Sequence, residues 1–304
     1  MSRFLQQSAF ADPIPAEVID RPTPVPRPGE VLVRVRAAGL NPVDWKLAIS
    51  PGAAEAFGLT LPTGLGNDLA GVVEAIGPDV TGFAVGDRVY GGARGAAIAD
   101  HAIVPASSLR LTPDGLSDEV AGSVQIAART AEAAVTAVAL EPGETVLIGG
   151  AAGGVGVLAV QLAVRAGATV IATASERNHE FLASLGAVPT TYGEGLADRV
   201  RALAPDGVDA AIDLQGVETA EAAVSLGVDP GRISTIAAGA SGPEGTVATG
   251  GNNASAGALE EIAQQLADGE LQLPIQQTFP LDEALDALAL LREGHVRGKL
   301  VVTP

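Results

Sequence analysis

The sequence predicts an α/β protein in which a doubly wound parallel sheet domain is joined to a β-rich domain. From about residue 117, short apolar runs alternate with helical patterns, as in a parallel sheet covered by helices on both faces. Before that point, prolines, glycines and short alternating runs are typical of strands and turns. The chain has 304 residues, of which 47% are hydrophobic, enough for two domain cores. We predict the sheet domain at 117–271 and the β-rich domain at 1–116 and 272–304.

The β-rich part contains three predicted strands. Valines at every second position from Val31 to Val35 indicate a strand with one buried face. The other two strands are Leu69–Ile76 and Asp87–Tyr90, and glycine-containing turns separate them. The segment Ala48–Gly64 is long, apolar and glycine-rich, so we predict a loop, which could be a lid over a substrate or an ordinary surface excursion.

The second part begins with an alanine-rich helix predicted at 118–140 and continues with alternating strands and helices. The predicted strands are 145–149, 169–174, 208–214 and 232–237, and the predicted helices are 155–166, 178–185, 196–203 and 218–226. A helix at 258–267, an amphipathic helix at 280–291 and a last strand at 299–302 follow. The segment after residue 271 could return to the β-rich part.

A glycine cluster stands where the first strand of the predicted sheet meets its helix. It reads Gly150-Ala151-Ala152-Gly153-Gly154-Val155-Gly156. A backbone without side chains can turn sharply there and approach a pyrophosphate, whose charge a helix N-terminus favours. The usual dinucleotide fingerprint, G-x-G-x-x-G, has alanine at its first glycine here, and a purely structural turn is the alternative. A second strand at βαβ spacing favours dinucleotide binding.

The residues after the second strand bear on which dinucleotide is bound. An acidic residue about twenty positions after the glycines holds the ribose hydroxyls of NADH, whereas a nearby arginine accommodates the 2′-phosphate of NADPH. Here the position is Ser175, which does not repel a phosphate, and Arg177 offers a planar set of donors. We therefore predict NADPH. Glu176 is the counter-argument, because a shift of one residue would place its carboxylate at the ribose; both charges could also simply be solvated.

Net charge and cysteine content exclude several classes of function. The net charge of −18 argues against nucleic-acid or anionic-membrane partners, which bind basic surfaces. The chain has no cysteine and its histidines lack metal-ligand spacing, so we predict no metal site. These histidines are His101, His179 and His295. Neither a membrane-spanning run nor a signal-peptide apolar region is found, and we expect a cytoplasmic protein without a membrane partner.

Several motifs along nearly the whole chain resemble those of the zinc-independent quinone oxidoreductase family, within the medium-chain dehydrogenase/reductase superfamily. One is similar to the family's substrate-side loop, two are similar to its β-barrel signature, and the phosphate loop has the alanine-containing form of this branch. In order, the motifs are Gly39–Lys46, Gly66–Gly77, Val85–Tyr90, Gly150–Gly156, Gly186-Ala187, Gly207–Asp213 and Gly298–Val302.

The resemblance implies a Rossmann domain with a GroES-like catalytic domain, and hydride transfer from NADPH to a quinone or an activated (α,β-unsaturated carbonyl) alkene. It also implies no zinc, because Asn67-Asp68 stands where zinc-dependent relatives have His-Glu. Relatives often form homodimers through an edge of the Rossmann sheet, for which Gly242–Gly251 is a candidate. A non-catalytic NADPH-binding sensor or structural protein on the same fold is the alternative.

The resemblance further assigns cofactor contacts residue by residue. It implies that Asn41 lies near the nicotinamide ribose and that Thr130 contacts the cofactor. Arg177 would clamp the 2′-phosphate, and Tyr192 would flank the adenosine phosphate. The strand end Ala237-Ala238-Gly239 would line the nicotinamide.

The candidate catalytic residues are Asn41, Asp44, Lys46 and Tyr90. Asp44 and Lys46 match polar positions on the substrate side of the family's loop. Lys46 and Tyr90 are candidates to donate a hydrogen bond to the carbonyl oxygen on which charge develops, and water could supply the final proton. Each has a simpler alternative. Asp44 could cap a helix, Lys46 could be a surface residue, and Tyr90 could pack in the core.

Overall fold

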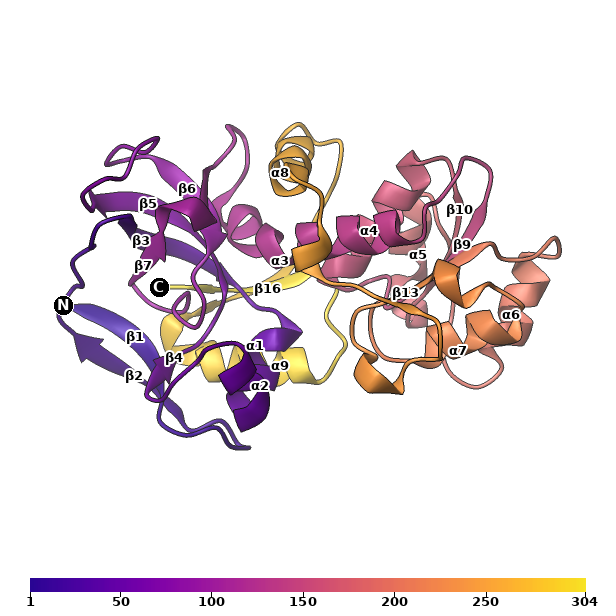
Figure 1. Cartoon of the computed structure of the whole chain (residues 1–304), viewed down its shortest axis with the longest axis horizontal. Helices are drawn as coiled ribbons and strands as arrows, with labels where there is room; N and C mark the ends of the chain where they lie inside the picture. The colour runs from indigo at the N-terminus through magenta and orange to yellow at the C-terminus, as the bar shows by residue number, and fades with distance from the viewer. The chain divides into compact units, whose positions relative to one another are not determined.

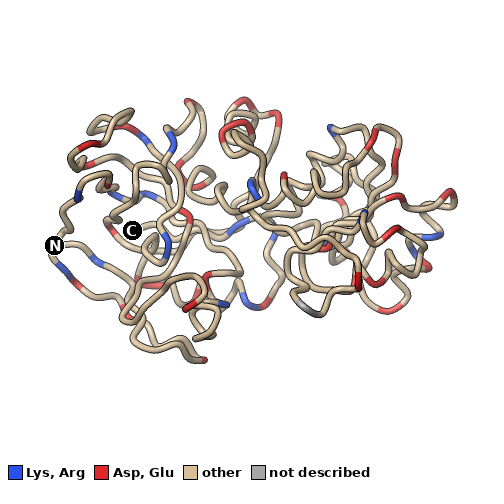
Figure 2. Tube along the Cα trace, viewed as in Figure 1, with Lys and Arg blue, Asp and Glu red and all other residues tan. Residues whose placement is uncertain are grey.

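The computed structural model of the chain describes residues 1–304, except for the side chain of Ala240. The chain divides into two compact units (Figure 1). Unit 1 comprises Met1–Gln125, Ala263–Asp268 and Pro274–Pro304, and unit 2 comprises Ile126–Ile262 and Gly269–Leu273. Acidic residues are spread over both units (Figure 2). Among the described residues, no helix is both long and apolar enough to cross a membrane.

The main sheet of unit 1 is built around the long strand β3 (Glu30–Gly39). Val31, Val33 and Val35 are buried and Arg34 and Arg36 are exposed, as predicted for a one-sided strand, but Leu32 is buried as well, so both faces are covered at the start of β3. The strand order is β15-β16-β3-β5-β6-β8, and β7 also pairs with β3. The partners of β3 and their neighbours are β5 (Asp68–Ile76), β6 (Arg88–Gly92), β7 (His101–Pro105), β8 (Leu109–Leu111), β15 (Ile275–Pro280) and β16 (Lys299–Thr303).

The C-terminal segment completes the core of unit 1. Strand β16 runs antiparallel to the end of β3, with Val302 opposite Ala38. Helix α9 (Ala284–Arg292) buries Ala284 and Leu288 in the same core. The helix predicted at 280–291 therefore begins later than expected, because β15 continues to Pro280 and a 3-10 turn precedes α9.

Unit 1 also contains a second sheet and two short helices. The sheet has the order β2-β1-β4, and these strands are Ala16–Arg21, Ser2–Gln7 and Thr63–Gly64. The helices are α1 (Pro42–Ile49) and α2 (Pro51–Ala56), so the loop predicted at Ala48–Gly64 is wrong in part. Helix α2 forms because Ser50 caps it, its Oγ accepting a hydrogen bond from the Ala53 N–H at 3.4 Å, and because proline suits a first helical position.

Unit 2 contains a six-stranded sheet with parallel pairings, in the order β11-β10-β9-β12-β13-β14. The first strand of the unit lies in the middle and the chain winds outward in both directions, which confirms the predicted doubly wound fold. The strands are β9 (Thr145–Gly149), β10 (Thr169–Thr173), β11 (Val188–Thr190), β12 (Ala210–Asp213), β13 (Ile233–Thr235) and β14 (Val247–Ala248).

Helices cover both faces of this sheet. One core contains residues of α4, α5 and the second half of α3 (Asp118–Ala137), and the other contains residues of α6 and α7. Four helices lie within one residue of their predicted bounds, namely α4 (Gly154–Arg165), α5 (His179–Ser184), α6 (Leu196–Leu203) and α7 (Glu218–Ser225). The helix predicted at 258–267 is α8 (Ala258–Ala267).

Candidate functional site

The turn between β9 and α4 forms a compact backbone cradle. Gly150 has a φ of +68°, in the left-handed region that favours glycine, and its carbonyl oxygen accepts a hydrogen bond from the Gly153 N–H at 3.1 Å. Helix α4 begins directly after Gly153, its N-cap. The N–H groups of its first turn have no intrahelical acceptors, as at any helix start. The predicted phosphate-loop residues Gly150–Gly156 all lie in this turn and the first residues of α4.

This cradle fits the pyrophosphate of a dinucleotide. A Cβ on Gly153 would meet only the Gly150 carbonyl oxygen within 4 Å, at 3.5 Å, so that side of the turn is open. A Cβ on Gly156 would lie 2.6 Å from Cα of Ala151, so this glycine lets helix and turn pack closely. Free N–H groups and the helix dipole favour an anion at such a helix start.

Ser175 lies just beyond the end of the neighbouring strand β10. It precedes a 3-10 turn (Glu176–Asn178), and its Oγ accepts a hydrogen bond from Nδ2 of Asn178 at 3.2 Å. Glu176 and Arg177 are both exposed on this turn. The second residue after β10 is therefore a half-buried serine, and an exposed arginine follows two positions later.

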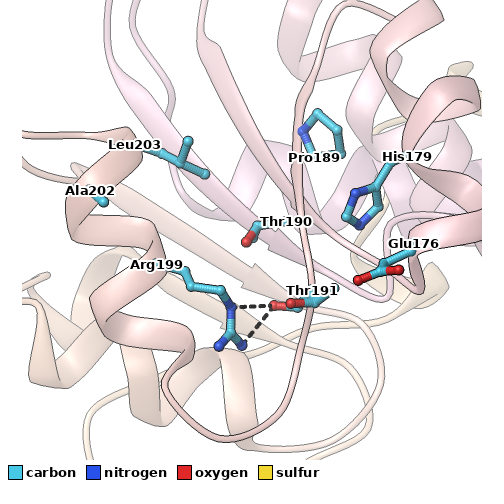
Figure 3. A pocket seen from close by; sticks show the side chains of 8 residues that line it. All are labelled: Glu176, His179, Pro189, Thr190, Thr191, Arg199, Ala202 and Leu203. Atoms are coloured by element: carbon cyan, nitrogen blue, oxygen red, sulfur yellow. Dashed lines mark hydrogen bonds between the residues drawn. The ribbon is translucent and has the colours of Figure 1, made fainter.

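Tyr192 lies in the loop between β11 and α6. Arg199 binds this loop, and Figure 3 shows its hydrogen bonds to Thr191. The Arg199 guanidinium group donates hydrogen bonds of 2.7 to 3.3 Å to four consecutive carbonyl oxygens of this loop, those of Thr191, Tyr192, Gly193 and Glu194. The Tyr192 side chain remains 46% exposed. Sequence reasoning missed Arg199, because an arginine on a surface helix carries no signal of what it binds.

A hollow of about 380 Å³ borders this loop, between α5 and α6 at the edge of β11. It is lined by Glu176, His179, Pro189, Thr190, Thr191, Arg199, Ala202 and Leu203 (Figure 3). Among the candidate cofactor residues, none lines it.

In unit 1, four side chains from distant parts of the sequence form a buried polar cluster, here called the Asn41 cluster. Nδ2 of Asn41 donates to Oδ2 of Asp68 at 3.0 Å, and Oδ1 of Asn41 accepts from Nζ of Lys299 at 2.6 Å. Asp44 accepts a hydrogen bond from the Asn41 N–H at 2.7 Å. The members are Asn41, Asp44, Asp68 and Lys299, none more than 4% exposed.

Asp44 has two roles in this cluster. Its bond to the Asn41 N–H joins the third residue of α1 to the N-cap, so Asp44 takes part in a capping box, but the N-cap itself is Asn41 and not Asp44 as the capping alternative supposed. Its other carboxylate oxygen accepts from Nδ2 of Asn67. Asp44 also lines a cavity of about 10 Å³, room for about one water molecule. The catalytic role of Asp44 stays a prediction.

Burial raises the pKa of Asp44 to about 7. Loss of hydration is the largest cause, and the Asp68 carboxylate adds to it, while the hydrogen bonds from Asn41 and Asn67 and the charge of Lys299 oppose it. Asp44 is therefore a buried acid whose charge changes near neutral pH.

An Asp44→Asn variant is expected to show a flatter dependence of stability on pH than the wild type. In the folded wild type the carboxyl group holds its proton up to a pKa of about 7, against an ordinary value of 3.8. Because the folded state binds more protons between these values, its free energy of unfolding falls as pH rises from about 4 to about 7, by up to roughly 4 kcal/mol. Melting temperatures recorded from about pH 5 to 8 test this, and parallel curves for the two proteins would contradict the raised pKa.

The other candidate catalytic residues lie in different surroundings. Lys46 is exposed on α1, with Nζ 5.8 Å from the centre of the Trp45 ring. Tyr90 is 1% exposed in β6, the placement expected of a core residue. Neither belongs to the Asn41 cluster, and their catalytic roles stay predictions.

In unit 2, Thr130 is buried on α3 at 7% exposure. The segment predicted to line the nicotinamide follows β13, with Ala238 buried and Gly239 exposed at a φ of +54°. Their contacts with a cofactor stay predictions.

The Asn41 cluster contains residues that sequence reasoning did not single out. Lys299 is the main one, and a signal existed, since it is the lone charged residue of a strand whose next three residues are Leu-Val-Val. Asn67 and Asp68 were noted for their position in the sequence, but not as partners of Asn41 and Asp44. The contact between Asp68 and Asn41 depends on the pairing of β5 with β3, because this pairing places Asp68 near the start of α1.

The cluster does not suit a zinc ion. Zinc in proteins is bound by thiolates, imidazoles and carboxylates, and the chain has no cysteine. The ammonium group of Lys299, 2.6 Å from Oδ1 of Asn41, would repel a metal cation placed among these groups. In the part of the chain that the structure describes, no three His, Asp or Glu side chains are grouped closely enough to hold a metal.

The chain is similar to known families of dehydrogenases. Residues 27–135 match the alcohol dehydrogenase GroES-like domain, and residues 185–302 match the zinc-binding dehydrogenase family. The quinone oxidoreductase of Pseudomonas aeruginosa is 31% identical over the full length of both chains. The NADPH-dependent alkenal/one oxidoreductase of Arabidopsis thaliana is 31% identical, over 90% of this chain and 72% of that protein.

Other relatives are much longer proteins. Erythronolide synthase EryA2 of Saccharopolyspora erythraea is 36% identical over 95% of this chain, which spans only 8% of that synthase. Among solved structures, mycobacterial Rv1454c complexed with NADPH has a TM-score of 0.86 and 28% sequence identity, with both chains covered completely.

Proposed function

The chain belongs to the quinone oxidoreductases of the medium-chain dehydrogenase/reductase superfamily, and from this premise we propose that it reduces quinones or activated alkenes with NADPH and without zinc. The activated alkenes would be α,β-unsaturated carbonyl compounds, as the name of the Arabidopsis relative suggests. NADPH in the mycobacterial structure supports the choice of cofactor.

One observation carries this proposal most directly. The glycine cradle at the start of α4 fits a pyrophosphate, and the strand beside it, β10, is followed by Ser175 and the exposed Arg177. A carboxylate at the position of Ser175 would repel the 2′-phosphate of NADPH, whereas a serine does not. Arginine is the residue best shaped for a phosphate, because its planar group donates two parallel hydrogen bonds.

Each part of the cofactor has a proposed partner. When bound, NADPH would supply the hydride, and the acceptor would take up that hydride and one proton. The first turn of α4 would bind the pyrophosphate, Arg177 the 2′-phosphate, and Tyr192 would flank the adenosine phosphate. Asn41 would contact the nicotinamide ribose. Thr130 and the segment Ala237–Gly239 complete the proposed cofactor contacts.

The substrate needs a hydrogen-bond donor at the carbonyl oxygen on which negative charge develops. Of the two candidates, Lys46 is exposed and Tyr90 is buried, so we propose Lys46 for this role. We also propose the predicted homodimer, which the size of the purified protein in solution would test.

The proposed activity is tested by following the oxidation of NADPH, and separately of NADH, with a panel of quinones and enones. NADPH-selective turnover of any acceptor supports the reductase. Tight NADPH binding without turnover across the panel would favour the alternative, a non-catalytic NADPH-binding protein. Failure to bind either cofactor would contradict both.

Arg177→Ala is expected to weaken NADPH binding about tenfold or more and to leave NADH binding nearly unchanged, because only NADPH carries the phosphate that the guanidinium group would bind. Dissociation constants from cofactor fluorescence measure the effect. Arg201→Ala is the matched control, since Arg201 is an exposed arginine of the same unit that pairs with Asp198 on α6. Equal losses for NADPH and NADH in Arg177→Ala would contradict the assignment.

A further inference from the structure

Lys299 is one of only two lysines in the chain, and the two lie in opposite surroundings. Lys46 is exposed on α1, whereas Lys299 is 4% exposed on β16. Burying an ammonium group is costly unless hydrogen-bond acceptors and opposite charges compensate for the lost water. The burial of Lys299 therefore needs a structural or functional reason.

The contacts of Lys299 supply part of that compensation. Nζ donates to Oδ1 of Asn41 at 2.6 Å, and Nδ2 of the same amide donates to Oδ2 of Asp68 at 3.0 Å. Burial lowers the pKa of Lys299, while the attraction of Asp68 and Asp44 raises it. The lysine and Asp68 thus bind opposite ends of one amide group.

This arrangement fixes which way the Asn41 amide faces. Nδ2 also donates to the carbonyl oxygen of Gly39 at 3.3 Å. In a flipped amide, Nδ2 would face the ammonium group of Lys299, and Oδ1 would face the Asp68 carboxylate and the Gly39 carbonyl. Donors would then meet donors and acceptors would meet acceptors. Lys299, Asp68 and the Gly39 carbonyl together leave Asn41 one orientation, and the bond to Gly39 is the longest of the three.

We propose that Lys299 is a positioning residue that acts through Asn41 and thereby holds the nicotinamide half of NADPH for hydride transfer. This inference rests on the proposed function, in which Asn41 contacts the nicotinamide ribose. A side chain already fixed in its binding orientation loses no freedom when the ligand arrives, and the reacting groups are placed more accurately. In this role Lys299 itself touches neither substrate nor cofactor.

Two variants separate positioning from simple charge balance. Lys299→Met leaves Asp68 buried without its neighbouring cation, so we expect a clearly lower melting temperature. The double variant Lys299→Met/Asp68→Asn removes both charges, so we expect most of that loss to be recovered. The new amide at position 68 can both donate and accept, and it therefore no longer dictates the orientation of Asn41.

The readout compares binding of NADPH with binding of 2′,5′-ADP, which carries only the adenosine half of the cofactor. We expect the double variant to bind NADPH about tenfold more weakly, to bind 2′,5′-ADP with an unchanged Kd, and to lose more than tenfold in kcat with little change in KM for the acceptor. Wild-type NADPH affinity and kcat in the double variant would overturn the inference, because Lys299 would then serve charge balance alone. A wild type that binds no NADPH would overturn the proposed function and this inference with it.

A measurement on the unmodified protein applies even if the variants do not fold. Protein labelled with ¹⁵N in its lysine side chains has two ammonium signals, which Lys46→Arg assigns by removing one of them. Saturating NADPH is expected to shift the Lys299 signal, and 2′,5′-ADP is expected to leave it in place. A Lys299 signal that NADPH does not move would overturn the inference.

Discussion

Gly156→Ala is expected to destabilise unit 2 by about 3 kcal/mol and to abolish NADPH binding. A Cβ at this position would lie against the carbonyl oxygen of Gly150 and 2.6 Å from Cα of Ala151. Both are backbone atoms of the turn that precedes α4, and backbone cannot move aside as a flexible side chain can. The helix start must therefore shift away from the turn, and the cradle for the pyrophosphate is lost. Urea unfolding followed by far-ultraviolet circular dichroism and NADPH fluorescence titration measure the two effects.

Gly153→Ala is the matched control for this prediction. Gly153 lies in the same turn at a φ of −75°, which any residue adopts, and a Cβ there would make only an ordinary contact of 3.5 Å. We expect this variant to unfold at the wild-type urea concentration and to bind NADPH only moderately more weakly. If both variants unfold at the same urea concentration, the close packing of Gly156 is not what the turn requires.

Asp213→Ala is expected to cost about 3 to 5 kcal/mol of stability. Asp213 is 1% exposed at the end of β12, and its two carboxylate oxygens accept four backbone N–H groups at 2.9 to 3.1 Å, those of Gln215, Gly216, Thr219 and Ala220. One side chain thus supplies hydrogen-bond acceptors for N–H groups in the loop after β12 and at the start of α7. Alanine would leave these donors without acceptors, partly in a buried place where water is excluded.

Asp209→Ala provides a comparison within the same segment of chain. Asp209 is exposed and accepts a single backbone hydrogen bond, from the Thr145 N–H at 2.8 Å. Its loss is expected to cost about 1 kcal/mol. Free energies of unfolding from urea titrations distinguish the two, and similar values for both variants would show that the four bonds of Asp213 are not a major source of stability.

The parts of the fold that were predicted correctly have a local periodic signal. The helices α6 and α7 each bury one stripe of small or aliphatic residues, α4 is a longer apolar helix buried on most sides, and β9 and β10 are apolar runs long enough to recognise. Helix α2 has only six residues and begins with Pro-Gly, so its composition indicated a loop. Strand β11 has three residues, one of them Pro189, and no periodicity can be detected over so short a run.

One part of the candidate site could be predicted from a local sequence pattern, and the other part could not. The phosphate loop is continuous in sequence, so its glycines and the strand that follows could be interpreted together. The Asn41 cluster joins residues 41, 68 and 299, whose proximity depends on the pairing of β3 with both β5 and β16. A local sequence pattern cannot predict contacts between residues so far apart in the chain. The four carbonyl contacts of Arg199 were missed for a related reason, since they depend on how a loop folds back over its helix.

The strand order of unit 2 gives the two ends of the proposed cofactor site different local stability. Strand β9, which leads into the phosphate cradle, is hydrogen-bonded on both sides, by β10 and β12. Strand β11, which leads to Tyr192, is a short edge strand paired only with β10, and the loop after it is held by side-chain hydrogen bonds from Arg199 and to Glu218. Local opening is rarest at the centre of a sheet and most frequent at its edges. We therefore expect the proposed pyrophosphate end to be more rigid before a cofactor binds than the proposed adenosine end, so that more of the entropic cost of binding would fall on the Tyr192 loop.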